Sequence, residues 1–104
     1  MRTTILLTYT GTAKDFFDRE YYCSKHLPYV EEVWKPYGLV SSRAFFPVVE
    51  EGKPGIVALC ECVFQDDAAV DAAFSSPRTP ELVADLANFT DLSLARSRVM
   101  NFPL

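Results

Sequence analysis

The sequence predicts an α+β fold in a single domain, and three observations support that prediction. The chain has 104 residues, a length that supports one hydrophobic core rather than two. Apolar residues make up 49% of it, too high a share for a disordered chain. Segments rich in β-forming residues are interspersed with segments of helical periodicity. We therefore expect residues 1–104 to fold as one domain of strands and helices.

The first half of the chain predicts a strand, a long helix and a second strand. Residues 3–9 are rich in β-forming side chains, and Gly11 then turns the chain. Helical periodicity runs over residues 13–37. Pro28 lacks a backbone donor and is expected to kink or split this helix. Residues 39–49 form the second predicted strand.

The second half predicts a hairpin, a split helix and a last strand. Turn-forming residues fill positions 50–55, and the most apolar strand follows at 56–64. A short helix is expected over 68–74, with a further helical segment capped by Thr79. The last strand is expected over 91–102. The order is β-α-β-β-α-β, the ferredoxin-like plan with its second helix split.

A sheet of this plan carries helices on one face only. The other face would be bare in a monomer, yet the chain contains eight Phe, five Tyr and one Trp. An apolar surface of that kind is most simply buried against a second copy of the chain. We therefore expect a homodimer formed through the open sheet face.

Composition narrows the remaining classes of function. The net charge is −4 and the ten cationic residues are scattered, so no nucleic-acid surface is expected. The apolar run near the N-terminus is too short for a signal peptide or a membrane span. We expect a cytoplasmic protein with no membrane partner. One histidine and three cysteines provide no plausible metal site, and no cofactor motif is present.

The long helix brings a polar cluster to its sheet-facing side. His26 has Tyr22 and Arg19 as neighbours at spacings of three and four residues, while Val30 and Trp34 share the same arc. The reference pKa of histidine, about 6.5, suits proton transfer near neutral pH. The alternative is a hydrogen-bonded histidine in the core with no chemical role.

The third strand contributes two thiols to one face. Side chains alternate along a strand, so Cys60 and Cys62 lie on the same side of the sheet, among small residues. A thiol beneath His26 would be a nucleophile or an acid. The alternative is that both cysteines are small buried hydrophobes. Which of the two thiols lies nearer His26 is left open by the sequence.

The segment 21–28, YYCSKHLP, resembles the YYxxxHxP signature of the EthD-like proteins, a family named for ethyl tert-butyl ether degradation. Residues 85–91 and the pattern Glu61-x-x-Phe64-x-Asp66 resemble further parts of that family. The resemblance covers nearly the whole chain. It implies that residues 1–104 form one EthD-like domain of the dimeric α+β barrel superfamily, in which two ferredoxin-like sheets pack face to face.

The resemblance also implies a chemistry. A related enzyme, methylmuconolactone methylisomerase, is cofactor-independent and uses a His on the first helix and a Cys on the third strand. His26 and Cys62 match these two positions, which implies a general acid–base and an assisting thiol. That enzyme also uses a tyrosine on the second strand and a second histidine, and this chain has neither at the matching positions.

These observations together predict a small-molecule function. We expect an EthD-like protein that binds or acts on a small, mainly apolar organic compound in a catabolic or biosynthetic pathway. Its chemistry would be of cofactor-independent isomerase or lyase type. Tyr22, Arg19, Val30, Trp34 and Cys60 would contact the ligand. The alternatives are a non-catalytic hydrophobic-ligand-binding or accessory protein of a degradation operon, and, more weakly, a haem-handling protein that uses the single histidine.

Overall fold

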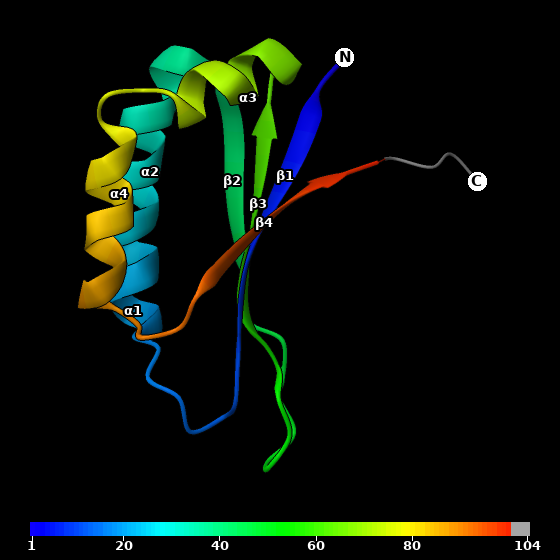
Figure 1. The fold of residues 1–104 in the computed structure, drawn as a ribbon, viewed down its shortest axis with the longest axis vertical. Coiled ribbons are helices and arrows are strands. Elements are labelled where there is room, and N and C mark those ends of the chain that lie inside the picture. Colours follow the sequence, from blue (N-terminus) through cyan, green and yellow to red (C-terminus); the bar gives the residue numbers. More distant parts are fainter. Residues whose placement is uncertain (101–104) are drawn as a thin grey trace.

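The computed structural model describes residues 1–100, and its element order is the predicted one (Figure 1). The elements are β1 (Thr3–Gly11), α1 (Arg19–Tyr21), a π-helical turn (Tyr22–His26), α2 (Leu27–Trp34), a 3₁₀ turn (Lys35–Tyr37), β2 (Leu39–Phe45), β3 (Gly55–Phe64), α3 (Asp67–Phe74), α4 (Thr79–Asp85), a second 3₁₀ turn (Leu86–Asn88) and β4 (Leu94–Val99). The α+β ferredoxin-like fold with a split second helix is thereby confirmed.

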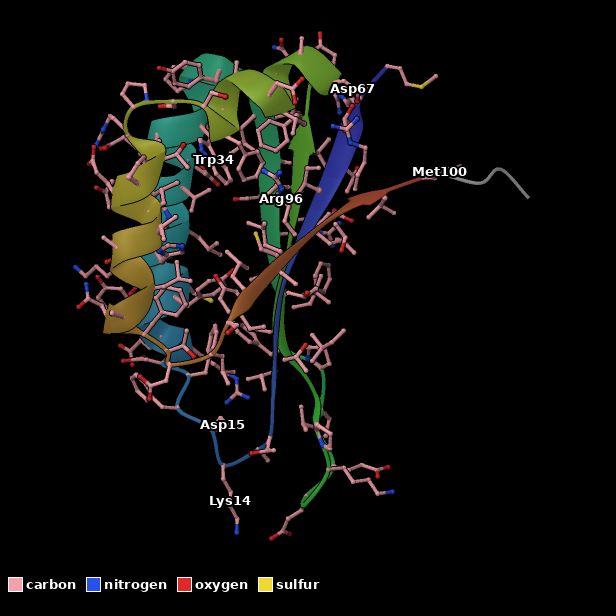
Figure 2. The ribbon with its side chains drawn as sticks, viewed as in Figure 1. Lys14, Asp15, Trp34, Asp67, Arg96 and Met100 are labelled. Atoms are coloured by element: carbon pink, nitrogen blue, oxygen red, sulfur yellow. The ribbon has the colours of Figure 1, made fainter. Side chains whose placement is uncertain are left out.

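Three predicted elements differ clearly in extent from the structure: the first helix, the second strand and the last strand. The first helix begins at Arg19 rather than at residue 13. Asp15 lies in the loop before it (Figure 2), where its carboxylate accepts a hydrogen bond from the backbone of Thr12 at 2.6 Å. The cap is Asp18, whose side chain accepts from the backbone of Tyr21. The second strand ends at residue 45 rather than 49. The last strand is shorter than predicted, and residues 101–102 of that prediction lie outside the described residues.

The sheet has the order β2-β3-β1-β4, and each neighbouring pair is antiparallel. Helices α2 and α4 lie on one side of it, and no element of residues 1–100 covers the other side (Figure 1). Burial follows the strand alternation: Thr3, Ile5, Leu7 and Tyr9 of β1 are buried on the helix side, while the residues between them are half-buried. The helix-side core is therefore complete, and the opposite face is open.

Aromatic side chains fill one end of the core. Tyr9, Tyr22 and Phe89 are each at most 1% exposed and meet edge-on or tilted, with ring centroids 5.1 to 5.9 Å apart. Phe17 packs into the same cluster, 5.3 Å from the ring of Tyr9. A continuous helix from residue 13 would turn Phe17 toward solvent, but the segment before α1 is not helical and Phe17 packs against the core.

The turn after the first helix needs a glycine. Gly38 has φ 107° and donates its backbone N–H to the carbonyl of Lys35. A Cβ atom at this position would lie 2.6 Å from the Cβ of Ala69 on α3. The close approach of this turn to α3 therefore depends on the absence of a side chain.

Within residues 1–100, no helix combines the length and the apolar character needed to span a lipid bilayer.

Candidate functional site

A π-helical turn places the histidine. Over Tyr22–His26 the helix takes in an extra residue per turn, and the backbone N–H of Leu27 donates to the carbonyl of Tyr22, five residues earlier. Pro28 follows in α2 and has no backbone N–H to donate to the turn before it. Irregular turns of this kind are frequent at functional sites. The result is that His26 points inward from a helix surface and is only 4% exposed.

Asp85 orients the imidazole of His26. The Nδ1 atom of His26 lies 2.8 Å from Oδ2 of Asp85, at the end of α4. The other carboxylate oxygen of Asp85 accepts hydrogen bonds from the hydroxyl of Tyr21 at 2.7 Å and from the amide of Asn88 at 2.9 Å. Both oxygens are thus engaged. This network joins the first helix to the segment before the last strand.

The electrostatics of the pair favour a neutral histidine beside a charged carboxylate. Burial lowers the pKa of His26 below its ordinary value, although the hydrogen bond and the charge of Asp85 oppose this effect. Burial alone would raise the pKa of Asp85, but the hydrogen bonds from Asn88, His26 and Tyr21 outweigh it and lower that pKa. A neutral ring next to a carboxylate carries its proton on Nδ1 and donates it to Asp85. The lone pair then lies on Nε2.

Two aromatic rings fix the plane of the imidazole. Tyr22 stacks against His26 with an interplanar angle of 19° and a centroid distance of 5.5 Å. Phe89 lies on it at a tilt, 4.6 Å away. The ring of His26 is therefore held by aromatic contacts as well as at Nδ1.

His26 lines a largely apolar cavity of about 80 Å³ on the helix side of the sheet. The walls come from β1, α2, the α3–α4 region and β4: Leu7, Tyr9, His26, Val30, Trp34, Phe74, Thr79, Leu82, Val83, Leu86 and Leu94. Nε2 of His26 makes no hydrogen bond to any of the described residues, and no fully buried side-chain nitrogen or oxygen among them lacks a partner. The lone pair on Nε2 is therefore accessible rather than sealed in.

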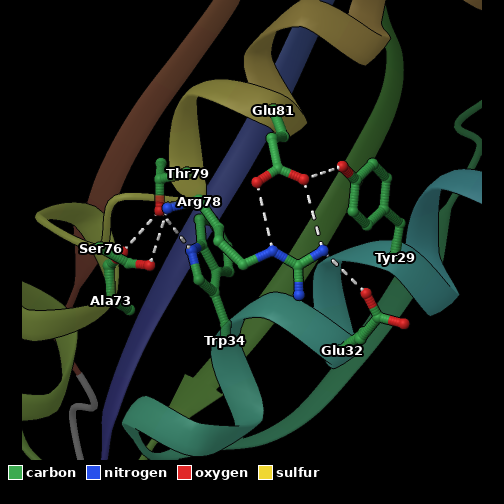
Figure 3. Close-up of polar contacts among 8 residues, drawn as sticks. All are labelled: Tyr29, Glu32, Trp34, Ala73, Ser76, Arg78, Thr79 and Glu81. Carbon is green, nitrogen blue, oxygen red and sulfur yellow. Dashed lines mark hydrogen bonds and ion pairs between the residues drawn. The ribbon is translucent and has the colours of Figure 1, made fainter.

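A polar clamp holds the two helices that form the cavity wall (Figure 3). Arg78 forms ion pairs with Glu81 on α4 and with Glu32 on the neighbouring helix α2. The hydroxyl of Tyr29, also on α2, donates a hydrogen bond to Glu81. Beneath it, the indole N–H of Trp34 donates to the hydroxyl of Thr79 at 3.0 Å. Since this last bond joins two residues of the wall, it sets the shape of the cavity.

The structure brings three of the predicted site residues together at the cavity. His26, Val30 and Trp34 all line it. Tyr22 lies behind His26 and holds its ring. Arg19 is exposed, with its guanidinium 5.4 Å from the ring of Phe46, and it is not part of the cavity wall.

The two predicted thiols lie apart from the cavity. Cys60 and Cys62 are at most 1% exposed, with their sulfur atoms 3.6 Å apart, and neither lines the wall. The hydrogen bond to Cys60 and burial raise the pKa of Cys62 well above its ordinary value, so this thiol is protonated. The small residues of β3 predict a crevice above that strand. The structure places the cavity over β1 and β4 instead, and no residue of β3 lines it.

Sequence reasoning missed the partner of the histidine. Asp85, Tyr21 and Asn88 form the network around His26, whereas helix phase alone predicts Tyr21 as an outward-facing aromatic residue. Asp85 and Asn88 both belong to the segment 85–91, and Tyr21 opens the YYxxxHxP segment. The YYxxxHxP segment and the segment 85–91 were therefore the sequence features that pointed to this network, because their side chains contact one another in the structure.

Neither the cavity nor the thiol pair resembles a metal centre. Among residues 1–100, no three His, Cys, Asp or Glu side chains are grouped so that they could hold a metal ion. The chemistry that the cavity offers is that of one imidazole with an accessible lone pair.

Known proteins resemble this chain in sequence and in fold. No family model matches the chain. An uncharacterized 11.0 kDa protein from the thcB-thcC intergenic region of Rhodococcus erythropolis is 28% identical over 88 residues, which cover 85% of this chain and 82% of that protein.

Solved structures share the fold at lower identity. An EthD-like protein from Ralstonia eutropha superposes with a TM-score of 0.79 at 22% identity, covering 94% of this chain and 89% of the other. A cofactor-independent oxygenase from Streptomyces nogalater, in a point-mutant form, gives a TM-score of 0.68 at 9% identity, covering 99% and 95%. The predicted resemblance is thus confirmed at the level of the fold: this chain has the ferredoxin-like α+β fold of the EthD-like proteins.

Proposed function

We propose that this chain is a cytoplasmic member of the EthD-like family that binds a small, mainly apolar organic compound beside His26 and transfers a proton on it. One observation supports this most directly: a buried histidine, held at Nδ1 by Asp85, lines an apolar cavity. The cofactor-independent oxygenase of the same fold supports chemistry without a bound cofactor.

The proposed step is general acid–base catalysis. Neutral His26 takes a proton from an acidic C–H or O–H of the ligand on Nε2, and the imidazolium that forms is stabilised by the charge of Asp85. Return of the proton to a different atom of the same ligand completes an isomerisation. Departure of a leaving group from the deprotonated ligand completes an elimination. Neither route changes the oxidation state overall.

Cys62 is a second candidate for proton transfer, as a donor. A thiol whose pKa is raised is a proton donor rather than a thiolate nucleophile. Its burial against Cys60 places it outside the cavity wall, so the proposed chemistry rests on His26 and Asp85. Tyr22 stacks on the ring of His26, Cys60 lies outside the cavity wall, and Val30 and Trp34 contact the ligand.

A ligand screen with matched variants tests the proposal. Small lactones and aromatic compounds are screened by thermal shift on the wild type, His26→Gln and Cys62→Ser, with Lys25→Gln as a control at a neighbouring exposed position. We expect a hit that the wild type, Lys25→Gln and Cys62→Ser convert, and that His26→Gln binds but does not convert. Equal turnover by His26→Gln would contradict the assignment. Binding by all four without turnover would indicate the non-catalytic, ligand-binding alternative.

We also propose that the chain forms a homodimer through the open sheet face. Leu6, Leu59 and Val63 are half-buried on that face, and the side chain of Phe45 on the edge strand is 40% exposed. Alternation in the registered strands puts all four on the same side, opposite the helices. A second copy would bury these side chains.

A further inference from the structure

A second hollow adjoins the His26 cavity on the same side of the sheet. It is a groove of about 610 Å³ between α3 and the strands β1 and β4. Its lining comprises Ile5, Val70, Asp71, Phe74, Ser75, Arg96 and Arg98. Phe74 lines both hollows, so one aromatic side chain forms their common wall.

The strand register shows how the two hollows follow one another. Leu94 of β4 is paired with Tyr9, and both line the cavity; Arg96 is paired with Leu7. Arg96 is the next residue of β4 on the helix side, about 7 Å further along the strand. The helix side of β4 therefore carries Leu94 beside the cavity and then two arginines, Arg96 and Arg98, beside the groove.

The arginines differ in their contacts. Arg98 forms an ion pair with Asp67 at 3.1 Å. The guanidinium of Arg96 lies 4.2 Å from the ring centroid of Phe74, and it forms no ion pair within residues 1–100 (labelled in Figure 2). Stacking on an aromatic face leaves the edge donors of a guanidinium available for a carboxylate. Asp71 is the groove's own negative charge and opposes an anion there.

We propose that the compound bound beside His26 carries a carboxylate, which Arg96 binds in this groove while the apolar part occupies the cavity. The inference rests on the proposed function and names its substrate class: small amphipathic organic acids. Phe74 contacts the ligand where its apolar part meets its charged end. Arg96 is then a specificity-determining residue, because it selects acids over neutral compounds of the same shape.

Paired probes test this directly. Binding of 3-phenylpropionate and of its neutral analogue 3-phenylpropanamide is measured by calorimetry, and the imidazole signals of the single histidine report occupancy of the cavity by NMR. The wild type should bind the acid about tenfold more tightly than the amide, a preference that shrinks with added salt. Arg96→Gln should lose the preference and keep the affinity for the amide, whereas Lys25→Gln, with the same change of charge, should keep both. Asp71→Asn should strengthen binding of the acid alone.

Failure of the carboxylate site and failure of the proposed function give different results in this experiment. If both probes shift the His26 signals with equal affinity, the carboxylate site is refuted and the proposed function stands. The same conclusion follows if Arg96→Gln weakens acid and amide alike, since the residue would then support structure only. If neither probe binds or shifts those signals, both the substrate class and the proposed cavity function are overturned.

Discussion

His26 shows how tertiary contacts define a residue's chemistry. On sequence grounds it is a lone histidine on an apolar helix face, for which a structural role is the alternative. In the structure, burial and the carboxylate of Asp85 act on it in opposite directions, and burial has the larger effect on its pKa. The ring is therefore both neutral and oriented, and these are the two properties required of a general base.

The lowered pKa predicts how stability depends on pH. In the unfolded chain His26 binds a proton near its ordinary pKa of 6.5, whereas in the folded chain it does so only at lower pH. Between the two values the unfolded state holds more protons, so the free energy of unfolding falls as the pH drops below about 6.5. Urea titrations from pH 7.5 to 5.5 should show this loss in the wild type.

His26→Gln keeps a donor for Asp85 and cannot titrate, so its stability should stay flat over the same range. The chain has no other histidine, which assigns the window to this residue. The contribution of Asp85 belongs to a separate pH window: because folding lowers the pKa of this carboxyl, the stability that it adds is present above its ordinary value of 3.8 and is lost as the pH falls from that value through the lower pKa of the folded state. An equal slope in the wild type and in His26→Gln would disprove the burial argument.

At the scale of elements, the π-helical turn and the glycine turn position the site. Pro28 predicted an interruption of the helix, and the structure has one in the residues just before it. The extra residue in that turn was not predictable, because the backbone of a π turn is stabilised by the packing of the side chains that it redirects, here Tyr22 and His26. The end of the helical segment, by contrast, agrees with the periodicity over residues 13–37, and Gly38 lies directly after it.

Gly38→Ala should test how tightly the glycine turn packs on α3. A left-handed backbone costs alanine about 1 to 2 kcal/mol, and the overlap with Ala69 adds a cost of about 1 to 3 kcal/mol. Gly52→Ala is the matched control, since Gly52 also has positive φ, at 78°, but has open space around it. In urea denaturation, Gly38→Ala should lose clearly more stability than Gly52→Ala. Equal losses would mean that the contact with Ala69 relaxes freely.

At the scale of the whole molecule, the open sheet face predicts an oligomer. Leu59→Asp places a charge in the middle of the face, on central strand β3, and should convert a dimer to a monomer because a buried unpaired carboxylate is costly. Ala87→Asp makes a comparable change at an exposed position on the helix side and should leave the dimer intact. Sedimentation velocity at micromolar concentration measures both. A wild type that sediments as a monomer would contradict the packed-sheet proposal.

The sequence predicted the element order and part of the cavity. Local patterns suffice for both, since alternation, periodicity and turn residues mark each element, and helix phase brings His26, Val30 and Trp34 to one side. Asp85 was not predicted as their partner because it is 59 positions away from His26, and its approach depends on how α4 packs against α2. The position of the cavity over β1 and β4 likewise depends on how the helices pack on the sheet, which strand alternation does not specify.

Because the three cysteines differ in burial, the reactivity of their thiols can report how often the helices separate from the sheet. Cys23 is exposed, while Cys60 and Cys62 lie under the helices on a central strand. A thiol reagent such as Ellman's reagent should therefore modify one site rapidly in the folded protein and the other two only when the helix layer separates from the sheet. The slow rate measures how often that layer detaches, and a ligand held between helices and sheet should reduce it.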